Sequence, residues 1–522
     1  MKDKKEIIKF FLDKSILISK QIIEKLAEND VDLNQFYENI KNKIDSDSFL
    51  ILDQHLEEFL VSTRKDINWK EYDKSVVLAK KGNDKLYDKF TEYMNGNEEE
   101  KPIGNKDVKI IFSYDEESKK REVQDFVYLF NKRFDSIEKI LKNRVELQNL
   151  LSIKRIKQKQ DKDNLSLIAI VGDKKITKNG NIILTVEDRT DSINVLINKN
   201  KPDLFKLARD IVADEIIGVV GVNGENIVFA NNVVWPEIPS NKEIKNADEE
   251  VFALFLSDLH VGSDNFLEEN MQKFLKWIKG EVGSEKQKEI AKKTKYIFIV
   301  GDLVDGCGIY PGQEEELVIN DIYKQYDECA KYLKEIPSNI NLIVCPGNHD
   351  AMRIAEPQPQ LYQDFAKSLW ELPNIHMVSN PSMVNIHSSD NFSGFDVLLY
   401  HGFSFDYYVA NVDGIRMNGG YDRADLIMKF LLKRRHLAPT HTSTLYVPDA
   451  NQDNLVIDKI PDFFVTGHIH KSSVSSYKNI TLICGSCWQS KTPFQEKVGH
   501  HPEPCRVPIV NLKTRDMKIM RF

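Results

Sequence analysis

The sequence predicts a multidomain α+β protein with an N-terminal helical region, a five-stranded β-barrel and a C-terminal α/β sandwich. Three observations lead to this prediction. The chain has 522 residues, whereas one hydrophobic core rarely serves more than about 250–300. Apolar residues recur at helical spacing near the N-terminus and at two-residue spacing from about residue 165. Beyond residue 250, short apolar runs lead into motifs rich in Asp and His, as at strand ends of an α/β sheet.

The N-terminal third offers no residue set that could carry chemistry. Residues 1–65 are expected to form a helical module, because apolar side chains such as Ile7 and Phe11 recur at helical spacing. Residues 66–160 are expected to form a charged linker with one helix over Glu122–Leu151. A docking role is the simplest interpretation of this part of the chain.

Residues 161–240 are expected to form a barrel of the oligonucleotide/oligosaccharide-binding (OB) type. Five short β-branched runs with turn signals between them predict its strands: Leu165–Val171, Ile182–Val186, Ile193–Ile197, Ile216–Val222 and Ile227–Val234. One helix-like stretch, Leu204–Val212, interrupts them. OB barrels bind single strands through stacked aromatic side chains, but these strands and their ends carry only Phe229 and Trp235. A structural or protein-docking barrel is therefore favoured over an autonomous DNA binder.

Residues 250–522 carry five motifs in a fixed order, each after an apolar run. These are Asp258-Leu-His260, Gly301-Asp302-Leu-Val-Asp305, Gly347-Asn348-His349-Asp350, His401-Gly402 and Gly467-His468-Ile-His470. Any one motif alone is most often a turn. Together they supply oxygen and nitrogen ligands for two adjacent metal ions, so the set predicts phosphoester hydrolysis.

The order of these motifs resembles that of the calcineurin-like metallophosphoesterase superfamily over Val251–Phe522. The resemblance implies a sandwich of two sheets with a dinuclear centre. It assigns Asp258, His260 and His470 to one ion, Asn348, His401 and His468 to the other, and Asp302 to both as a bridge. A mixed oxygen and nitrogen site suits Mn²⁺, Fe or Zn²⁺, and the nuclease branch of the superfamily favours Mn²⁺.

The same resemblance implies roles for residues that are not ligands. His349 is expected to approach the scissile phosphate, where it stabilises transition-state charge or protonates the leaving oxygen. Asp350 is expected to orient His349 by a hydrogen bond. For Asp305, support of a metal ligand is favoured, and a helix N-cap is the alternative.

A further segment resembles the small subunits of replicative DNA polymerases. It comprises Lys433-Arg-Arg-His-Leu-Ala-Pro-Thr-His441 and the later Val447-Pro448-Asp449, and a barrel precedes it as in those proteins. Because every metal ligand is present, the resemblance is to the archaeal family D subunits. It implies a 3′→5′ exonuclease that removes mismatched nucleotides from the 3′ end of DNA beside a separate large catalytic subunit. Candidate strand contacts, for which salt-bridge roles remain equally open, are Arg416, Arg423, Arg434 and Arg435.

Three other functions remain as alternatives. The first is a non-catalytic scaffold subunit with a vestigial metal site. The second is a stand-alone nuclease of the double-strand-break-repair type, which shares the motifs but lacks an upstream barrel. The third is a phosphatase or cyclic-nucleotide phosphodiesterase, which has no evident use for a barrel.

The composition limits how the chain can interact with DNA. A net charge of −8 and a pI near 5.9 are unusual for a protein that coats nucleic acid, so a partner is expected to supply most of the contacts with DNA. No signal peptide or apolar run of membrane-spanning length is present, which predicts a cytoplasmic protein without a membrane partner. Cys484 and Cys487 have zinc-knuckle spacing but no second pair, so buried thiols are expected there.

Overall fold

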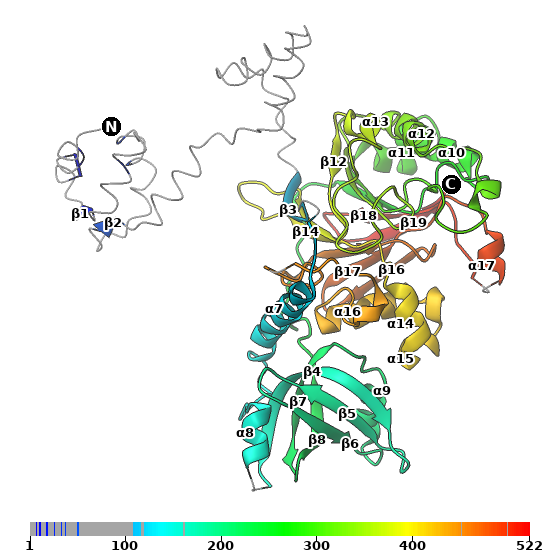
Figure 1. Ribbon diagram of the computed structural model, residues 1–522. Helices are drawn as coiled ribbons and strands as arrows, with labels where there is room; N and C mark the ends of the chain where they lie inside the picture. Colours follow the sequence, from blue (N-terminus) through cyan, green and yellow to red (C-terminus); the bar gives the residue numbers. More distant parts are fainter. Residues whose placement is uncertain are drawn as a thin grey trace. The chain divides into compact units, whose positions relative to one another are not determined.

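The computed structural model describes residues 108–115, 119–159, 162–449, 451–497 and 500–522, with isolated positions before residue 52 (Figure 1). The chain divides into two compact units, Met1–Ile103 and Gly104–Phe522. In the first, a short parallel pair joins β1 (Leu17–Ile18) to β2 (Leu50–Ile51). The helical module expected over residues 1–65 otherwise lies outside the described residues, as do residues 66–107 of the expected linker.

The second unit begins with β3 (Val108–Ser113) and then contains a closed five-stranded barrel in the order β4-β5-β6-β8-β7. The strands are β4 (Asn164–Ile176), β5 (Ile182–Glu187), β6 (Ser192–Ile197), β7 (Ile216–Asn223) and β8 (Ile227–Val234), with α9 (Pro202–Arg209) between β6 and β7. Alternate residues such as Leu184, Val195 and Val219 are fully buried in its core. The predicted barrel is confirmed, and its OB character remains an interpretation.

The C-terminal part is a sandwich of two six-stranded sheets. The first has the order β12-β11-β10-β9-β18-β19 and the second β16-β17-β15-β14-β13-β3. The first contains β9 (Phe252–Leu256), β10 (Thr294–Val300), β11 (Asn341–Cys345), β12 (Ile375–Met377), β18 (Arg506–Asn511) and β19 (Met517–Arg521). The second contains β3, β13 (Ser382–Ile386), β14 (Phe395–Leu399), β15 (Phe463–Thr466), β16 (Ser473–Tyr477) and β17 (Ile480–Cys484). Between the sheets, Phe255 stacks on Phe298 at a centroid distance of 5.1 Å.

Helices pack against the outer faces of both sheets. Side chains of α10 (Glu268–Ile278), α11 (Glu285–Lys292), α12 (Ile322–Lys334) and α13 (Lys367–Trp370) share a core with the first sheet. Those of α14 (Phe405–Asn411), α15 (Asp413–Arg416) and α16 (Ala424–Arg434) share a core with the second. A short helix, α17 (Pro493–Lys497), lies near the C-terminus. The predicted α+β class is thus confirmed for the described residues, none of whose helices could cross a membrane.

Two segments differ from expectation. Val108–Ser113 was expected as linker, but it forms β3 and pairs antiparallel with β13, which gives its backbone groups partners along the sheet edge. The predicted helix over Glu122–Leu151 is the shorter α7 (Val123–Leu141). The chain turns after Leu141, and Leu147 then packs with Leu141 and barrel residues in one apolar cluster. A short helix, α8 (Ile153–Gln158), follows.

Candidate metal centre

The five motifs converge because they follow neighbouring strands. Asp258, Asp302 and Asn348 come two or three residues after β9, β10 and β11, which are adjacent and parallel. His401 and His468 follow β14 and β15, a parallel pair in the other sheet. The carboxyl ends of these strands therefore deliver all the motifs to one edge of the sandwich.

The backbone at this edge is in an unusual conformation. Five of the predicted ligands have positive φ angles: Asp258 (51°), His260 (52°), Asp302 (52°), His468 (71°) and His470 (50°). For residues other than glycine, this region costs on the order of 1–3 kcal/mol each and is concentrated at functional sites. The surrounding packing must hold these turns in place, and it does so where chemistry is expected.

At two motif positions, a residue larger than glycine would collide with a predicted ligand. A Cβ atom on Gly301 would lie 2.1 Å from Nδ1 of His401, and one on Gly347 would lie 2.2 Å from Oδ1 of Asp302. Either contact is far inside van der Waals distance. The loops can approach the ligands this closely only because both positions lack a side chain.

The first group of donors consists of Asp258, His260 and His470, all buried. Nε2 of His470 lies 3.4 Å from Oδ1 of Asp258 and 3.1 Å from Nε2 of His260. Nδ1 of His260 donates to Oδ1 of Asp305 at 3.0 Å, so its Nε2 lone pair points into the site. Asp305 thus supports a ligand, and among the described helices none starts at Asp305 to be capped by it.

The second group consists of Asp302, His401 and His468, with Asn348 beside them. Nδ1 of His401 donates to the carbonyl oxygen of Val300 at 2.9 Å. Its Nε2 therefore faces Oδ1 of Asn348 at 3.0 Å and Oδ2 of Asp302 at 3.2 Å, and it offers a lone pair to a cation once its proton has left. The same Asp302 oxygen is 3.9 Å from Nε2 of His260, so this carboxylate lies between the two groups.

The chemistry of these donors fits divalent cations. Imidazole nitrogens and carboxylate oxygens face one another at distances at which a shared divalent cation would bind them all. Burial lowers the pKa of His401, but Asp302 and Asp258 outweigh burial and raise it to about 10. Burial also lowers the pKa of His260, but the hydrogen bond that its ring donates to Asp305 and the charge of nearby carboxylates outweigh burial and raise this pKa to about 9. Cations must therefore compete with protons for these imidazoles.

His349 lies at the mouth of this arrangement. Its Nδ1 donates to the carbonyl oxygen of Asp305 at 2.8 Å, which leaves Nε2 free, and its backbone N–H donates to Oδ1 of Asp302 at 2.8 Å. It lines a cavity of about 340 Å³ together with His260, Asp302 and His470. Burial lowers its pKa, so the ring is neutral at pH 7. Its ring also lies near enough to His260 and Asp302 to join a donor group, although the resemblance gives it a different role.

Asp350 does not occupy the place expected for it. Its carboxylate accepts hydrogen bonds from the backbone N–H of Gly347 (2.8 Å) and Leu303 (3.4 Å) and from the hydroxyl of Tyr326 (3.1 Å). The described partner of the His349 ring is instead the Asp305 carbonyl. Burial raises the pKa of Asp350 to about 7. Asp350 therefore shapes the loop that carries Asn348 and His349, and it orients His349 only through that loop.

Several residues at the site were missed by sequence reasoning. Gln489 donates to Oδ1 of Asp305 at 3.1 Å, Gln495 pairs with Nδ1 of His470 at 2.9 Å, and Asp406 pairs with Nε2 of His468 at 3.0 Å. His500, which the motifs did not include, also lines the cavity. No motif marks these positions, since only the fold brings them to the site.

Two of the four arginines predicted to contact DNA are buried. Arg434 is 5% exposed and forms an ion pair with Glu215, the residue directly before β7. It also donates to the carbonyl oxygen of Asp210 at 2.7 Å. Arg435 is 4% exposed and donates to the carbonyl oxygens of Ile457 and Asp458. The prediction was wrong for both, because a basic run in sequence does not reveal which side chains the fold buries.

The other two arginines are more exposed but already paired. Arg416 binds Asp413 at 2.6 Å, and Arg423 binds Asp425 at 2.8 Å. A DNA contact by either one stays a prediction. The cysteines expected to be buried, Cys484 and Cys487, are both fully buried free thiols.

Facing sheets with Asp, Asn and His side chains on the loops after their strands define the class of calcineurin-like phosphoesterases. A family model with the description "Calcineurin-like phosphoesterase" matches residues 253–472. The resemblance inferred from the five motifs is thereby confirmed.

Similar proteins show to which family of this class the chain belongs. The chain is 39% identical over 401 residues to the DNA polymerase II small subunit of Methanothermobacter thermautotrophicus. This match covers 77% of this chain and 80% of that protein. The proteins of the same name from Methanocaldococcus jannaschii (39% identical) and Pyrococcus horikoshii (36%) match 75% and 77% of this chain. These matches span 64% and 63% of the two relatives, slightly less than two thirds of their length. The chain belongs to the family of archaeal DNA polymerase II small subunits.

Proposed function

We propose that this chain is the small subunit of a two-subunit replicative DNA polymerase and carries its 3′→5′ proofreading exonuclease. The observation that carries the proposal is a complete donor set, buried except for the half-buried Asn348 and His468, with His349 at the cavity, in a chain of this family. A separate large subunit is expected to perform synthesis, and DNA with a 3′ end is the expected substrate.

The residues suit phosphodiester hydrolysis because separate groups would hold the metal ions and exchange the proton. Two divalent ions, for which Mn²⁺ is favoured over Fe and Zn²⁺, would neutralise the phosphate and lower the pKa of water. Asp302, between the two donor groups, fixes the spacing of the site. Nε2 of His349 is free to exchange a proton with an oxygen of the scissile phosphate or its leaving group.

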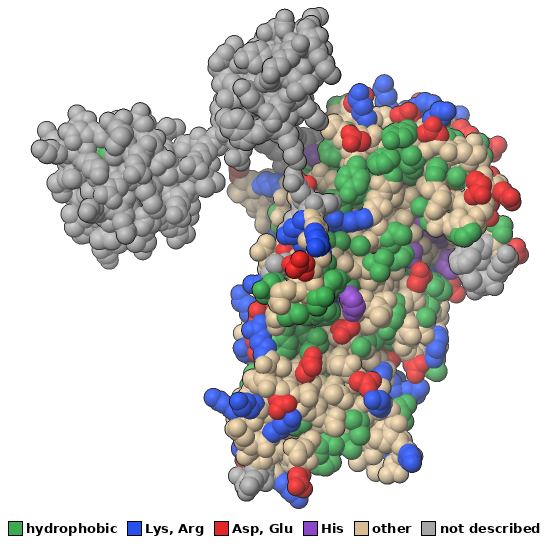
Figure 2. All heavy atoms as spheres, in the orientation of Figure 1, with side chains coloured by type: hydrophobic (Ala, Val, Ile, Leu, Met, Phe, Trp, Pro, Cys, Tyr) green, Lys and Arg blue, Asp and Glu red, His purple; other side chains and the backbone are tan. Residues whose placement is uncertain are grey.

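The charge distribution is consistent with dependence on a partner. Acidic residues outnumber basic ones, 80 to 72. On the face shown in Figure 2, acidic and basic side chains are interspersed over the described part of the chain rather than gathered into one basic stripe. The large subunit is therefore expected to provide most phosphate contacts.

The barrel favours docking over strand binding. Of the two aromatic residues near its strands, Trp235 is buried and only Phe229 is exposed, at 46%. One exposed ring makes a poor platform for stacked bases. An OB-type barrel used as a subunit contact remains our interpretation.

Product analysis distinguishes this proposal from its alternatives. With Mn²⁺, a 5′-labelled single strand should release 5′-mononucleotides from its 3′ end, and a circular single strand should stay intact. Cleavage of the circle would indicate a nuclease with internal cuts. The absence of hydrolysis, with or without the large subunit, would favour the scaffold.

A further inference from the structure

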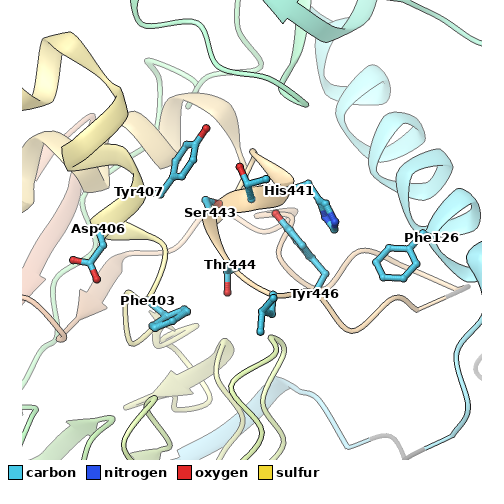
Figure 3. Close-up of a pocket in the computed structure, with 10 residues that line it drawn as sticks. Phe126, Phe403, Asp406, Tyr407, His441, Ser443, Thr444 and Tyr446 are labelled. Carbon is cyan, nitrogen blue, oxygen red and sulfur yellow. The ribbon is translucent and has the colours of Figure 1, made fainter. Parts of the chain in front are cut away.

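A second cavity, of about 610 Å³, opens beside the metal centre. We call it the aromatic pocket and define it by Phe126, Phe403, Tyr407, His441, Leu445 and Tyr446. Figure 3 shows Phe403 and Tyr407 on one side, His441 and Phe126 on the other, and Tyr446 between them. Phe126 comes from α7, Phe403 from the loop after β14, and Tyr407 from α14. His441 and Tyr446 come from the segment that follows α16.

The aromatic pocket is continuous with the metal centre through shared residues. Asp406 lines both cavities, and its carboxylate pairs with Nε2 of His468 at 3.0 Å. The ring of Phe403 lies edge-on to that of His468, with centroids 5.8 Å apart. A group held in the aromatic pocket would therefore adjoin one held at the metals.

The lining suits a flat apolar group rather than a phosphate. None of the described residues that line it is Lys or Arg, and Asp406 would repel an anion. One wall is fixed by stacking of His441 on Tyr446, at 5.2 Å and 16°, with Phe126 edge-on to His441 at 5.8 Å. Leu445 projects with 61% exposure. Nucleobases stack on such aromatic surfaces with little dependence on sequence.

We propose that the aromatic pocket receives an unpaired base next to the scissile phosphate, and thereby selects frayed 3′ ends. The proposal rests on the proposed function and deepens it. A base within a duplex is already stacked and paired, whereas a mismatched base can leave the helix at little cost. The pocket volume lies within the roughly 300–1,000 Å³ typical of small-ligand sites. Selection for mismatches would thus come from stacking, separately from hydrolysis at the metals.

Photocrosslinking tests the pocket without relying on hydrolysis. The full chain would be irradiated with an oligonucleotide that carries 5-iododeoxyuridine at its 3′-terminal or penultimate position. A phosphorothioate linkage and Ca²⁺ in place of Mn²⁺ keep the strand intact. We expect crosslinks at Phe403 or Tyr407. Loss of one aromatic stack should lower the yield at Phe403 about tenfold in Tyr407→Ala, and loss of an apolar contact should lower it in Leu445→Ala, whereas Tyr407→Phe should retain it.

The control is Tyr323→Ala, which removes a tyrosine that is 52% exposed and lies outside the pocket. It should leave the crosslink yield unchanged. Crosslinks that map elsewhere, or a yield insensitive to both Tyr407→Ala and Leu445→Ala, would overturn the inference. If crosslinks map to the pocket but no strand is ever hydrolysed, the pocket stands and the proposed nuclease fails.

Discussion

At the residue scale, we assign His349 to the chemical step and the donor residues around it to metal binding. His349 is held by the Asp305 carbonyl and by its own backbone contact with Asp302. The ligands that the resemblance names hold one another in two groups joined by Asp302. This division makes opposite predictions for substitutions at the two kinds of position.

We expect His349→Ala to abolish hydrolysis while leaving most of the bound metal. The substitution removes the only group assigned to proton exchange, which typically contributes about 10²–10⁴-fold to the rate. Metal content of the purified variant, measured by inductively coupled plasma mass spectrometry beside its activity, checks this. Loss of metal from the variant would show that His349 is a ligand.

We expect Asp302→Asn to lose both activity and bound metal. The amide keeps the shape but removes the negative charge that lies between the two donor groups, at 3.2 Å from His401 and 3.9 Å from His260. Titration with Mn²⁺ should show affinity weakened by at least about tenfold, since even partners of ligands typically contribute 10–100-fold. Wild-type metal content in Asp302→Asn would refute the bridging assignment.

Metal binding should tighten as the pH rises. The pKa values of His260 and His401, about 9 and about 10, lie above 6.5, so both rings are protonated at pH 7 and must release protons to bind a cation. Between pH 6 and 8 the apparent Kd for Mn²⁺ should fall about tenfold per pH unit for each proton displaced. Calorimetry in two buffers of different ionisation enthalpy counts those protons. A Kd independent of pH over this range would contradict the electrostatics described.

The motifs predicted a set of donor residues that the structure brings together, because metal chemistry restricts both residue type and spacing. They failed for Arg434 and Arg435, whose partners Asp210 and Ile457 are distant in sequence. They also failed for Asp350, since adjacency to His349 in sequence suggested a bond that the turn directs elsewhere. Contacts made only by the fold leave no mark in a local pattern.

At the element scale, α7 and the polymerase-like segment Lys433–His441 form a structural joint. Arg133 of α7 is 1% exposed and pairs with buried Asp453 at 2.6 Å. It also donates to the carbonyl oxygen of Pro439 at 2.9 Å. From the same segment, Thr440 donates to the carbonyl oxygen of Ala213 in the barrel. The segment thus joins the helix and the barrel to the sandwich.

Arg133→Met should destabilise the protein by about 3–5 kcal/mol, because it removes the guanidinium that neutralises the buried carboxylate of Asp453 and leaves it only the contact with His436 at 3.0 Å. The free energy of unfolding from urea denaturation measures this. Arg144→Met, which removes a partly exposed ion pair with Glu146 on the turn after α7, is the matched control and should cost at most about 1 kcal/mol. Equal effects of the two substitutions would show that the joint is not important for stability.

Element positions were largely predictable where apolar residues alternate, as in β5, or form a continuous run, as in β11. The end of α7 was not, because apolar residues such as Val145 and Leu147 continue beyond Leu141, although the helix ends there. β3 was hidden in a charged stretch, since an edge strand can expose residues such as Ile110 and Lys109. Its pairing with β13 depends on a partner about 270 residues away.

At the scale of the whole molecule, the chain combines a barrel, a calcineurin-like phosphoesterase domain with candidate metal-binding groups, and an excess of acidic over basic residues. An isolated nuclease would need its own basic contacts with the DNA phosphates, whereas for a subunit the partner can provide those contacts. The account therefore predicts hydrolysis that the large subunit strengthens, chiefly at low substrate concentration.

The most direct test follows degradation of a 5′-labelled primer with a 3′ mismatch by the purified chain in Mn²⁺, with and without the large subunit. We predict stepwise shortening from the 3′ end, faster for the mismatched than for the matched primer, and none with His349→Ala. A primer that keeps its full length under both conditions, or that His349→Ala shortens at the wild-type rate, would contradict the account.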